Sequence, residues 1–466
     1  MRDLKFFAKN DTINLQSAII ILMSDAFVKI KQWLLLTGDF ISFYLALLLS
    51  LIARYRGEFL AETWQTHLAP FTLIYFVWIL VFYINGLYDL RRAKNNLEFG
   101  RLFFGGLAVN AALAIGFFYL APWVGIAPKT NLFLVLIFVV VLIYGWRMLF
   151  NFLIVNSFAK TRILFLGESQ ESEEIIRLIE REPQLGYEIA DVIVPSNEIA
   201  LQNIIDEKKV NIIVLGEHLN KTPELTHALY QTIFSQMTFV DIITFFENLT
   251  GRVPVAALNE SWFLENLKEA DKKLYNFFKT AGDFILALIF AVLLIAILPL
   301  IAIAIKLQDR GSVFYTQKRI GLDGREYIIY KFRTMIENAE SAGAQFAGMK
   351  DNRITPVGKF LRKTRLDELP QVWNILRGEM SFVGPRPERS EFVSELTRQM
   401  PFYAVRHLIK PGLTGWAQIN YPYAGTFEEN LKKLEYDLYY LKNRSILLDI
   451  AILFKTLNIV LRFKGR

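Results

Sequence analysis

Two adjacent acidic residues, Asp367 and Glu368, are the first candidates for chemistry. Pro370 suits the first turn of a helix, and apolar residues at helical spacing follow it through Leu376. The pair therefore lies at or just before a predicted helix N-terminus, where unpaired N–H groups and the helix dipole stabilise negative charge. A carboxylate held in this way can attack phosphorus or bind Mg²⁺. The alternative is an ordinary helix cap, which uses the same residue types.

Basic residues surround this acidic pair in the sequence. Arg386 lies between Pro385 and Pro387, which restrict the backbone and make its guanidinium a preorganised fork for phosphate. The other conspicuous cations of this stretch are Lys331, Arg333, Arg353, Arg362 and Arg365. Such a set predicts a phosphate ligand, although a solvated basic surface would have the same composition.

The composition of the chain excludes several classes of protein. It has 466 residues, no cysteine and four histidines, which are scattered without the spacing of metal ligands. Disulfide-rich folds and thiolate metal sites are therefore excluded. Hydrophobic residues make up 53% of the chain, and its mean hydropathy is +0.31. The net charge of +7 favours an anionic partner, and the apolar excess indicates a lipid bilayer rather than nucleic acid.

The first third of the chain predicts a four-helix transmembrane domain over residues 33–158. Its apolar stretches are 33–53, 68–88, 102–123 and 131–155, each close to the ~20 residues that cross a bilayer. Basic residues concentrate in the N-terminal segment, 1–32, and in the second loop. The positive-inside rule therefore places both, and everything after residue 158, in the cytoplasm. We expect Asp39 to pair within the bundle and Arg147 to extend toward the cytoplasmic interface.

A fifth apolar stretch, residues 284–305, has basic residues on both flanks and Pro299 inside it. A crossing helix should show a charge bias between its ends, and a proline kinks or breaks a helix. These features favour a re-entrant helix that enters one leaflet, bends at Pro299 and returns. A fifth span with a proline kink is the alternative, and it would place the C-terminal third on the opposite side of the membrane.

Between the membrane segments, residues 159–250 predict a Rossmann-like α/β domain. Apolar strand-like runs at 163–166, 191–194, 211–215 and 238–242 alternate with helical patterns at 172–180 and 223–235. The first strand is followed by one glycine, Gly167, where a dinucleotide turn needs three, and Glu168 would repel a pyrophosphate. We therefore expect no dinucleotide there. Residues 251–274 would form a linker, and 275–466 a mostly α-helical catalytic domain.

Four ordered blocks of the C-terminal third resemble one family. The blocks are residues 331–335 (KFRTM), 361–371 (LRKTRLDELPQ), 378–388 (GEMSFVGPRPE) and 410–418 (KPGLTGWAQ). They are similar to the signature blocks of the bacterial sugar transferases, the polyprenyl-phosphate hexose-1-phosphate transferases. The four N-terminal spans and the α/β insert match the layout of the large form of this family, which includes undecaprenyl-phosphate galactose and glucose phosphotransferases.

The resemblance implies a reaction and roles for residues. Members transfer a sugar 1-phosphate from a UDP-hexose to undecaprenyl phosphate, release UMP, and so begin exopolysaccharide, capsule or O-antigen synthesis. By resemblance Asp367 is the nucleophile that forms a phosphosugar intermediate, and Glu368 binds Mg²⁺. Phosphate-neutralising roles fall to Lys331, Arg333, Arg362 and Arg386, and Gln418 belongs to a block that shapes the nucleotide pocket. The family's membrane helix is re-entrant with a proline break, matching Pro299.

The resulting expectation is a multi-pass protein of the bacterial inner membrane, a homodimer, with its catalytic domain on the cytoplasmic face. One rival is a membrane sensor or regulator that has a degenerate transferase domain. Another is a transporter or scaffold built on the four spans, which would need more polar intramembrane residues than Asp39, Asn110 and Arg147. Release of UMP separates the enzyme from both.

Overall fold

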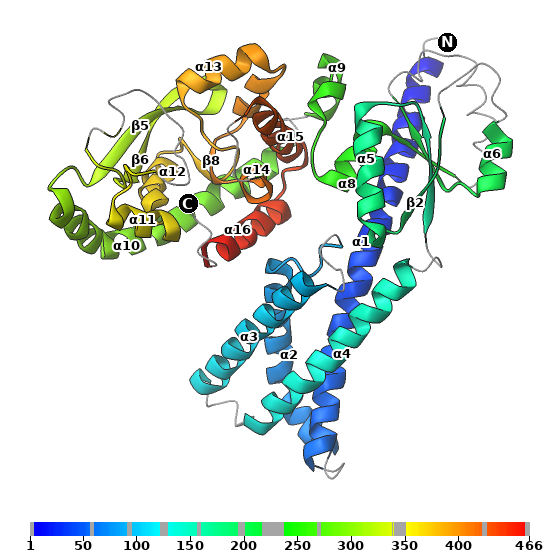
Figure 1. Ribbon diagram of the computed structural model, residues 1–466, viewed down its shortest axis with the longest axis horizontal. Coiled ribbons are helices and arrows are strands. Elements are labelled where there is room, and N and C mark those ends of the chain that lie inside the picture. The colour runs from blue at the N-terminus through cyan, green and yellow to red at the C-terminus, as the bar shows by residue number, and fades with distance from the viewer. Residues whose placement is uncertain are drawn as a thin grey trace. The chain divides into compact units, whose positions relative to one another are not determined.

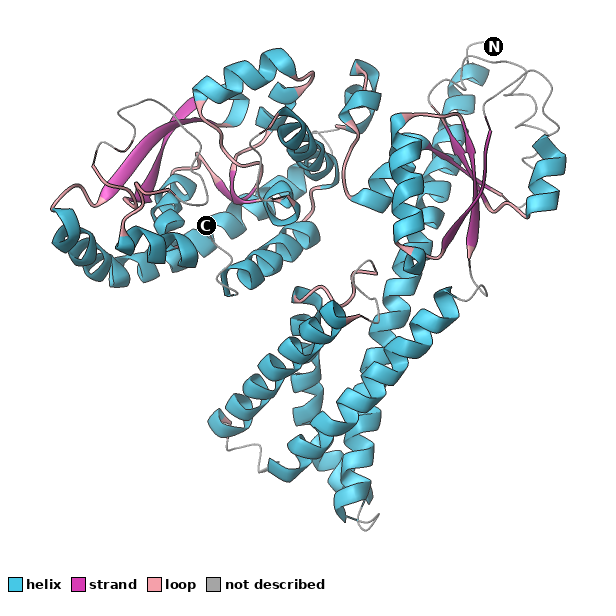
Figure 2. Ribbon diagram, viewed as in Figure 1, coloured by secondary structure: helices cyan, strands magenta, loops and turns pink. Residues whose placement is uncertain are grey.

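The computed structural model describes residues 4–55, 60–90, 96–121, 129–155, 160–193, 201–216, 237–267, 272–337, 339, 351–421 and 426–461. The chain folds as two units, residues 1–249 and 250–466 (Figure 1). The first unit contains the N-terminal helices and a parallel sheet (Figure 2), and the second contains all the predicted catalytic residues.

Four long helices open the first unit, and each contains an apolar stretch long enough to cross a membrane. They are α1 (Leu4–Tyr55), α2 (Leu60–Ile84), α3 (Leu97–Leu120) and α4 (Lys129–Val155). Helix α1 packs against α2 and α4, and α2 packs against α3. Aromatic side chains such as Phe43, Tyr75 and Trp78 are fully buried between them. In the described part of the chain, these four helices and one helix of the second unit are long and apolar enough to cross a membrane.

Arg147 does not extend toward the membrane surface as we expected. Its Nη2 donates to Asp39 Oδ2 at 2.5 Å, and its Nη1 donates to the Leu87 carbonyl at 2.7 Å. Both charged side chains are almost completely buried. An unpaired charge in this bundle would cost more free energy than the paired one, so Arg147 turns inward to the acid. The expected pairing of Asp39 within the bundle is confirmed.

The rest of the first unit is an α/β domain. Its strands are β1 (Thr161–Leu166), β2 (Tyr187–Ile193), β3 (Ile212–Leu215) and β4 (Thr238–Asp241), and its helical segments are α5 (Gln170–Arg181), η2 (Pro183–Leu185), α6 (Leu201–Lys208) and α8 (Ile242–Thr250). The strands form one parallel sheet in the order β2-β1-β3-β4. The predicted parallel α/β architecture is thus present, although β2 begins earlier than its apolar run. The helix expected at 223–235 lies outside the described residues, and a specifically Rossmann-like fold stays a prediction.

The second unit has sixteen short or long elements in the described residues. In chain order they are η5 (Val255–Ala257), α9 (Glu260–Asn266), α10 (Lys273–Asp309), β5 (Phe314–Ile320), η7 (Leu322–Gly324), β6 (Glu326–Phe332), α11 (Pro356–Thr364), η8 (Leu366–Gln371), α12 (Val372–Leu376), β7 (Ser381–Val383), α13 (Ser390–Gln399), η9 (Tyr403–Leu408), β8 (Gly412–Thr414), α14 (Trp416–Asn420), α15 (Phe427–Asn443) and α16 (Ile446–Leu461). Strands β5 and β6 pair antiparallel, whereas β7 and β8 pair parallel. The unit is mostly helical, as predicted.

Much of the stretch expected as a linker, residues 251–274, is folded onto the second unit. Arg252 makes an ion pair of 2.7 Å with Glu435 of α15, and the Val253 N–H donates to the Glu435 carbonyl at 3.1 Å. The indole N–H of Trp416 donates to the Gly251 carbonyl at 2.8 Å. These tertiary contacts involve side chains far along the chain, so local composition alone indicated a linker.

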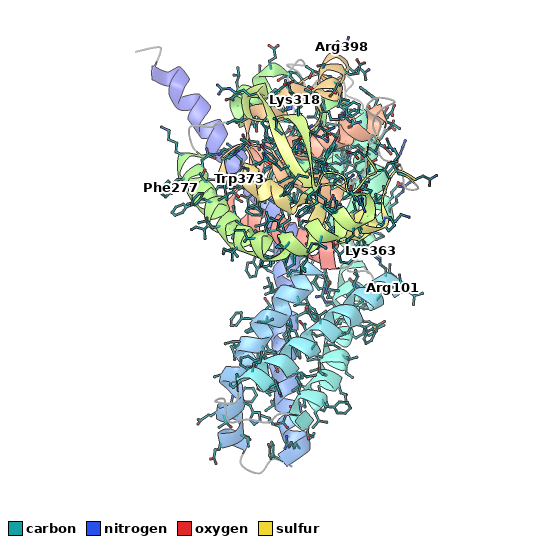
Figure 3. All side chains as sticks on the ribbon, turned by 90° about the vertical axis from the view of Figure 1, so that its left-hand side faces the viewer. Arg101, Phe277, Lys318, Lys363, Trp373 and Arg398 are labelled. Carbon is teal, nitrogen blue, oxygen red and sulfur yellow. The ribbon has the colours of Figure 1, made fainter. Side chains whose placement is uncertain are left out.

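Helix α10 carries the fifth apolar stretch and is longer than predicted. It is one continuous helix through Pro299 rather than two halves joined at a break, and Figure 3 shows it as a bowed rod. Near its beginning, Tyr275 donates to Asp449 at 2.9 Å, and near its end Asp309 pairs with Arg333. Both ends are therefore held by the same unit. A proline removes one backbone hydrogen bond, and packing on either side of Pro299 keeps the helix intact.

One face of α10 packs along the rest of the second unit, and the other is exposed. Ala287, Ile301 and Ile305 are buried against it, and α11, α12 and α16 contact the helix (Figure 1). Large apolar side chains cover the opposite face, namely Phe284, Ile285, Leu288, Ile289, Val292, Leu293, Ile295, Leu300, Ile303 and Leu307. An apolar surface of this extent needs a nonaqueous neighbour. A lipid bilayer provides one, which agrees with the membrane character of the chain.

Candidate active site

The acidic pair lies on a tight turn between two short helices. Arg365 ends α11 in the left-handed conformation, with φ of 60°, and this reverses the chain into the 3-10 helix η8. Asp367 and Glu368 are both inside η8, with 9% and 7% of their surfaces exposed. Strand β6 packs against η8, which brings the side chain of Lys331 to the acids. The predicted position before a helix is confirmed, because α12 begins at Val372.

Glu368 is surrounded by cations. Its Oε1 accepts from Lys331 Nζ at 2.9 Å and from Arg386 Nη2 at 3.1 Å, and its Oε2 lies 3.7 Å from Arg365 Nη1. Burial by itself would raise the pKa of this carboxyl, but Lys331, Arg386 and Arg365 outweigh burial and hold the pKa well below its usual range. Glu368 is therefore an anion at any physiological pH.

Asp367 has a different environment, although it is the adjacent residue. Its Oδ1 is buried and has no hydrogen-bond partner among the described residues. Burial and the neighbouring Glu368 raise the pKa of the Asp367 carboxyl, while Lys331, Arg365 and Arg362 oppose the increase. A buried carboxylate oxygen without a donor is costly, and such groups occur where function requires them. Asp367 thus differs from Glu368 in having a carboxylate oxygen that no described residue engages.

The backbone around Arg386 is held by a second layer of charges. The Arg386 carbonyl accepts from Arg406 Nη2 at 3.0 Å, and the same guanidinium pairs with Asp437 at 2.7 Å. Arg406 and Asp437 are both almost fully buried. Together with the flanking prolines, this contact orients Arg386 toward Glu368. This pair could not be found from the sequence motifs, because Arg406 lies on η9 and Asp437 on α15, outside the four blocks.

A small pocket opens at this cluster. It is lined by Arg319, Ile329, Lys331, Glu368, Gln371, Arg386, Pro387, Gly412 and Leu413. Sequence reasoning identified Lys331, Glu368 and Arg386 but missed Arg319 and Gln371 as site residues. Arg319 lies on β5, near the basic flank of the apolar stretch, where a cation is readily attributed to the membrane surface. Gln371 ends the block that contains the acids, so its position offered a signal.

Three predicted residues lie close to this pocket without lining it, and the first is Asp367, the neighbour of the lining residue Glu368. Arg362 donates from Nε to Thr334 Oγ1 at 2.9 Å, and its charge still acts on Asp367. Gln418 donates to the carbonyl of Leu413, a lining residue, at 3.2 Å, while its Oε1 is buried without a hydrogen-bond partner in the described part of the chain. Arg362 and Gln418 therefore contact residues around the pocket and do not line it themselves.

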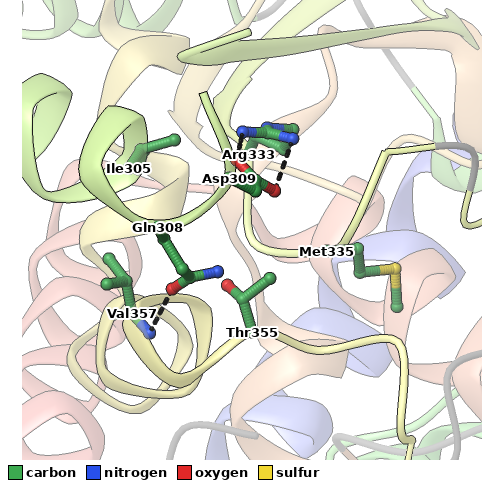
Figure 4. Close-up of a pocket in the computed structure, with 7 residues that line it drawn as sticks. All are labelled: Ile305, Gln308, Asp309, Arg333, Met335, Thr355 and Val357. Carbon is green, nitrogen blue, oxygen red and sulfur yellow. Dashed lines mark hydrogen bonds and ion pairs between the residues drawn. The ribbon is translucent and has the colours of Figure 1, made fainter. Parts of the chain in front are cut away.

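Arg333 is not part of the phosphate-binding cluster that we expected it to join. Its Nη1 donates to Asp309 Oδ2 at 2.9 Å, Nη2 pairs with the other carboxylate oxygen, and Nε donates to the Ser312 carbonyl at 2.6 Å. Figure 4 shows this pair in a separate pocket that Gln308, Met335 and other residues line at the end of α10. Because all three guanidinium nitrogens are engaged, Arg333 anchors α10 to the end of β6.

The acidic pair fits Mg²⁺ only together with phosphate oxygens. The described residues contain no cluster of three potential metal-ligating side chains. Magnesium is commonly held by one or two carboxylates together with substrate phosphates and water, so two acids are sufficient. The unpartnered Asp367 Oδ1 is a suitable oxygen, whereas Glu368 is engaged by cations. Its role as a metal ligand stays a prediction.

Comparisons with known proteins identify the family. The model of the family described as bacterial sugar transferase matches residues 274–463. The UDP-N-acetylgalactosamine-undecaprenyl-phosphate N-acetylgalactosaminephosphotransferase of Aeromonas hydrophila is 44% identical over 215 residues, 46% of this chain and 50% of that protein. The UDP-glucose:undecaprenyl-phosphate glucose-1-phosphate transferase of Escherichia coli K12 is 33% identical over 333 residues, 66% of this chain and 68% of that protein.

A relative of the same name from Klebsiella pneumoniae is 32% identical over 330 residues, 66% of this chain and 68% of that protein. This chain thus spans half the length of the Aeromonas relative and about two thirds of the other two. The matches of 333 and 330 residues are longer than the second unit and therefore extend beyond it. The chain belongs to the bacterial sugar transferase family, in its large form, whose members are phosphoglycosyl transferases.

Proposed function

We propose that this protein transfers a hexose 1-phosphate from a UDP-sugar to undecaprenyl phosphate and releases UMP. The observation that carries the proposal is the contrast within the acidic pair. Glu368 is neutralised by cations, whereas the buried Asp367 Oδ1 has no hydrogen-bond partner in the described residues. A ligand with two negatively charged phosphates complements the pocket cations, and an uncommitted carboxylate provides the nucleophile.

In the first step Asp367 attacks the β-phosphorus, which bears the sugar. The bond between this phosphorus and the bridging oxygen breaks, and UMP leaves with the bridging oxygen and its electron pair. The sugar phosphate is then joined to the aspartate as an acyl phosphate. Lys331 and Arg386 neutralise charge on the phosphate oxygens, because both contribute N–H donors beside the acids. Burial strips water from the Asp367 carboxylate, and a carboxylate without its hydration shell is the better nucleophile.

In the second step a phosphate oxygen of undecaprenyl phosphate attacks the same phosphorus. Asp367 is released as a carboxylate, and the product is undecaprenyl-diphosphate-sugar. Two bulky anions thus use one pocket in turn, and the covalent step removes the need to hold both together. Mg²⁺ bound beside Asp367 and Glu368 would supply additional charge stabilisation for the phosphate oxygens.

The membrane arrangement follows from where the substrates are. UDP-sugars are cytoplasmic and the acceptor lies in the bilayer, so the pocket must face the cytoplasm at the membrane surface. Four spans and a non-crossing α10 satisfy this requirement, and the attachment of both ends of α10 to one unit supports it. We therefore place the protein in the bacterial inner membrane, with α10 as a continuous helix that enters and leaves the bilayer on the cytoplasmic side without crossing it. A cysteine replacing Arg310 should label only from the cytoplasmic side. A homodimer remains part of the proposal.

The first test is UMP release by the full chain in nanodiscs, with Mg²⁺, undecaprenyl phosphate and a panel of UDP-hexoses. The panel includes UDP-glucose and UDP-N-acetylgalactosamine, which the relatives' names contain. Asp367→Asn should abolish release, and label from the β-phosphate should remain on the wild-type protein when the acceptor is omitted. Absence of both release and labelling with every sugar would favour the sensor with a degenerate transferase domain.

A further inference from the structure

Arg319 is a pocket cation whose charge is poorly neutralised. It lines the same pocket as Lys331, Glu368 and Arg386. The nearest carboxylate is Glu388, whose Oε2 lies 3.8 Å from Arg319 Nη1. That carboxylate is already paired with Lys433 at 2.6 Å. Its one weak ion pair therefore leaves most of the Arg319 charge available to an anion.

The hydrogen bonds of Arg319 also leave capacity for a ligand. Its Nη1 donates to the Pro387 carbonyl at 3.1 Å, and its Nη2 donates to Gln317 Oε1 at 2.6 Å. Its Nε is buried without a hydrogen-bond partner in the described part of the chain. A guanidinium has five N–H donors. Two of them donate to protein acceptors and the Nε–H is buried, so the remaining Nη N–H groups can donate to one more acceptor.

The register of the β5–β6 hairpin places Arg319 and Lys331 on one face of the sheet. Lys331 is opposite Tyr315, and Arg319 is opposite Tyr327. Residues directly opposite share a face, and so do residues at even spacing along a strand. Arg319 therefore lies four residues from Tyr315, about 13 Å along the same face. Both long side chains nevertheless line one pocket, so they can contact adjacent phosphates of a single ligand.

Asp367 and Arg319 are influenced by different sets of charges. The charges that act on Asp367 come from Glu368, Lys331, Arg365 and Arg362. The charges that act on Arg319 are instead those of Glu388, Arg386 and Arg389. Arg386 is common to both groups, because it also pairs with Glu368 at 3.1 Å. An anion bound at Arg386 can therefore also reach Arg319, which lines the same pocket.

We propose that Arg319 binds the α-phosphate of the nucleotide and stabilises UMP as it leaves. This inference rests on the proposed function, in which Asp367 attacks the β-phosphorus. The bond that breaks joins the β-phosphorus to the bridging oxygen, and negative charge develops on that oxygen and on the α-phosphate. Arg319 supplies a cation on the side away from the nucleophile, where this charge forms. The shared chemistry is a phosphate group, and the acceptor's phosphate is the other possible source.

The test compares three variants of the full chain in nanodiscs. Arg319→Gln removes the charge, and Arg319→Lys retains it without the fork. Lys318→Ala is the matched control, because Lys318 is the adjacent residue of β5 and its side chain is 71% exposed (Figure 3). UMP and uridine binding are measured by calorimetry, alongside UMP inhibition, KM for the UDP-sugar, KM for undecaprenyl phosphate, and Tm.

Arg319→Gln should weaken UMP binding and inhibition about tenfold or more, since a hydrogen bond to a charged group is lost. Uridine binding and KM for undecaprenyl phosphate should change less than about twofold. Arg319→Lys should recover part of the UMP affinity, and Lys318→Ala should match wild type. A tenfold rise in KM for undecaprenyl phosphate with normal UMP binding would assign Arg319 to the acceptor and overturn the proposal.

Two other outcomes would also overturn it. Unchanged UMP binding in Arg319→Gln would show that the α-phosphate lies elsewhere. A large drop in Tm with equal losses in every parameter would assign Arg319 a structural role through Pro387 and Gln317. The direct binding measurement separates this inference from the proposed function. A wild-type protein that binds UMP but does not turn over any UDP-sugar contradicts the function and still allows the Arg319 comparison.

Discussion

Lys331 and Arg333 are two residues apart in one short motif, yet the surrounding charges of the two side chains differ. Arg333 pairs with a single carboxylate, Asp309, and a backbone carbonyl, so its site is charge-balanced and closed by contacts within the protein. Lys331 shares Glu368 with Arg386, and the adjacent Asp367 Oδ1 has no hydrogen-bond partner in the described residues. The comparison shows that charge balance distinguishes a structural ion pair from a binding site, whereas residue type does not.

The largest expected effect is at the Lys331 site, the one that contacts within the protein do not close. Asp367→Asn should reduce UMP release at least about 10³-fold, because an amide cannot act as the nucleophile. Asp309→Asn, the same change on the balanced side, should keep kcat within about threefold. Steady-state UMP release by both variants checks this, with Tm as the control for folding. Equal loss of activity in the two variants would erase the distinction between the sites.

A second change acts on the charge balance of the catalytic pocket. Glu368→Gln leaves Lys331, Arg386 and Arg365 without their shared anion. Turnover should fall about 10²-fold, yet UMP should bind more tightly in the presence of a chelator because the pocket is more positive. Calorimetry with EDTA measures the binding. Glu391→Gln, at a side chain that is 61% exposed, is the control. Weaker metal-free binding would contradict the proposed role of the cations.

On the balanced side, Arg333→Gln should affect stability more than catalysis. Removing one partner leaves Asp309 uncompensated, and Asp309 is only partly buried, so we expect a loss of about 1–2 kcal/mol. The double variant with Asp309→Asn should recover part of this loss. Thermal unfolding in detergent measures both, and activity per folded molecule should stay within about threefold of wild type. A selective rise in KM for the UDP-sugar would return Arg333 to the substrate site.

The smallest expected effect concerns His407, which follows Arg406, the residue that holds the Arg386 carbonyl. Burial and the adjacent Arg406 lower the pKa of His407 to about 4, from an unfolded value of 6.5. The unfolded chain therefore binds more protons between these values, and the stability from neutral His407 is present above pH 6.5 and lost as pH falls toward 4. His407→Gln should reduce the destabilisation between pH 7 and pH 5 by about 1 kcal/mol, allowing for partial exposure. Parallel Tm–pH curves for wild type and variant would contradict this.

Much of the architecture could be predicted from the sequence because it depends on local pattern. The apolar stretches overlap the four N-terminal helices, although α1 begins at Leu4 and not near residue 33, and the alternation of strands and helices indicated a parallel sheet. The acidic pair and Arg386 were predicted to act on the same phosphate ligand, and in the structure Arg386 pairs with Glu368. In each case the informative residues are close together in the chain or repeat with a fixed period.

The predictions that were wrong share one physical cause. In each case the residue or segment contacts a part of the chain that is distant in sequence, and local sequence does not reveal such a contact. Arg147 was expected to reach water, but Asp39 on another helix holds it inside the bundle. Residues 251–274 were expected to form a linker, yet Arg252 finds Glu435 in α15. Pro299 was expected to break α10, and packing on both sides keeps the helix continuous.

By itself the sequence determined that this chain is a membrane protein of the sugar transferase family, because hydropathy and motif blocks are properties of consecutive residues. Only the tertiary structure decided which charges meet. It joined Arg319 from β5 to the catalytic pocket and withdrew Arg333 from it. Ion pairing depends on distances of a few ångströms between distant parts of the chain, and those distances arise only when the elements pack.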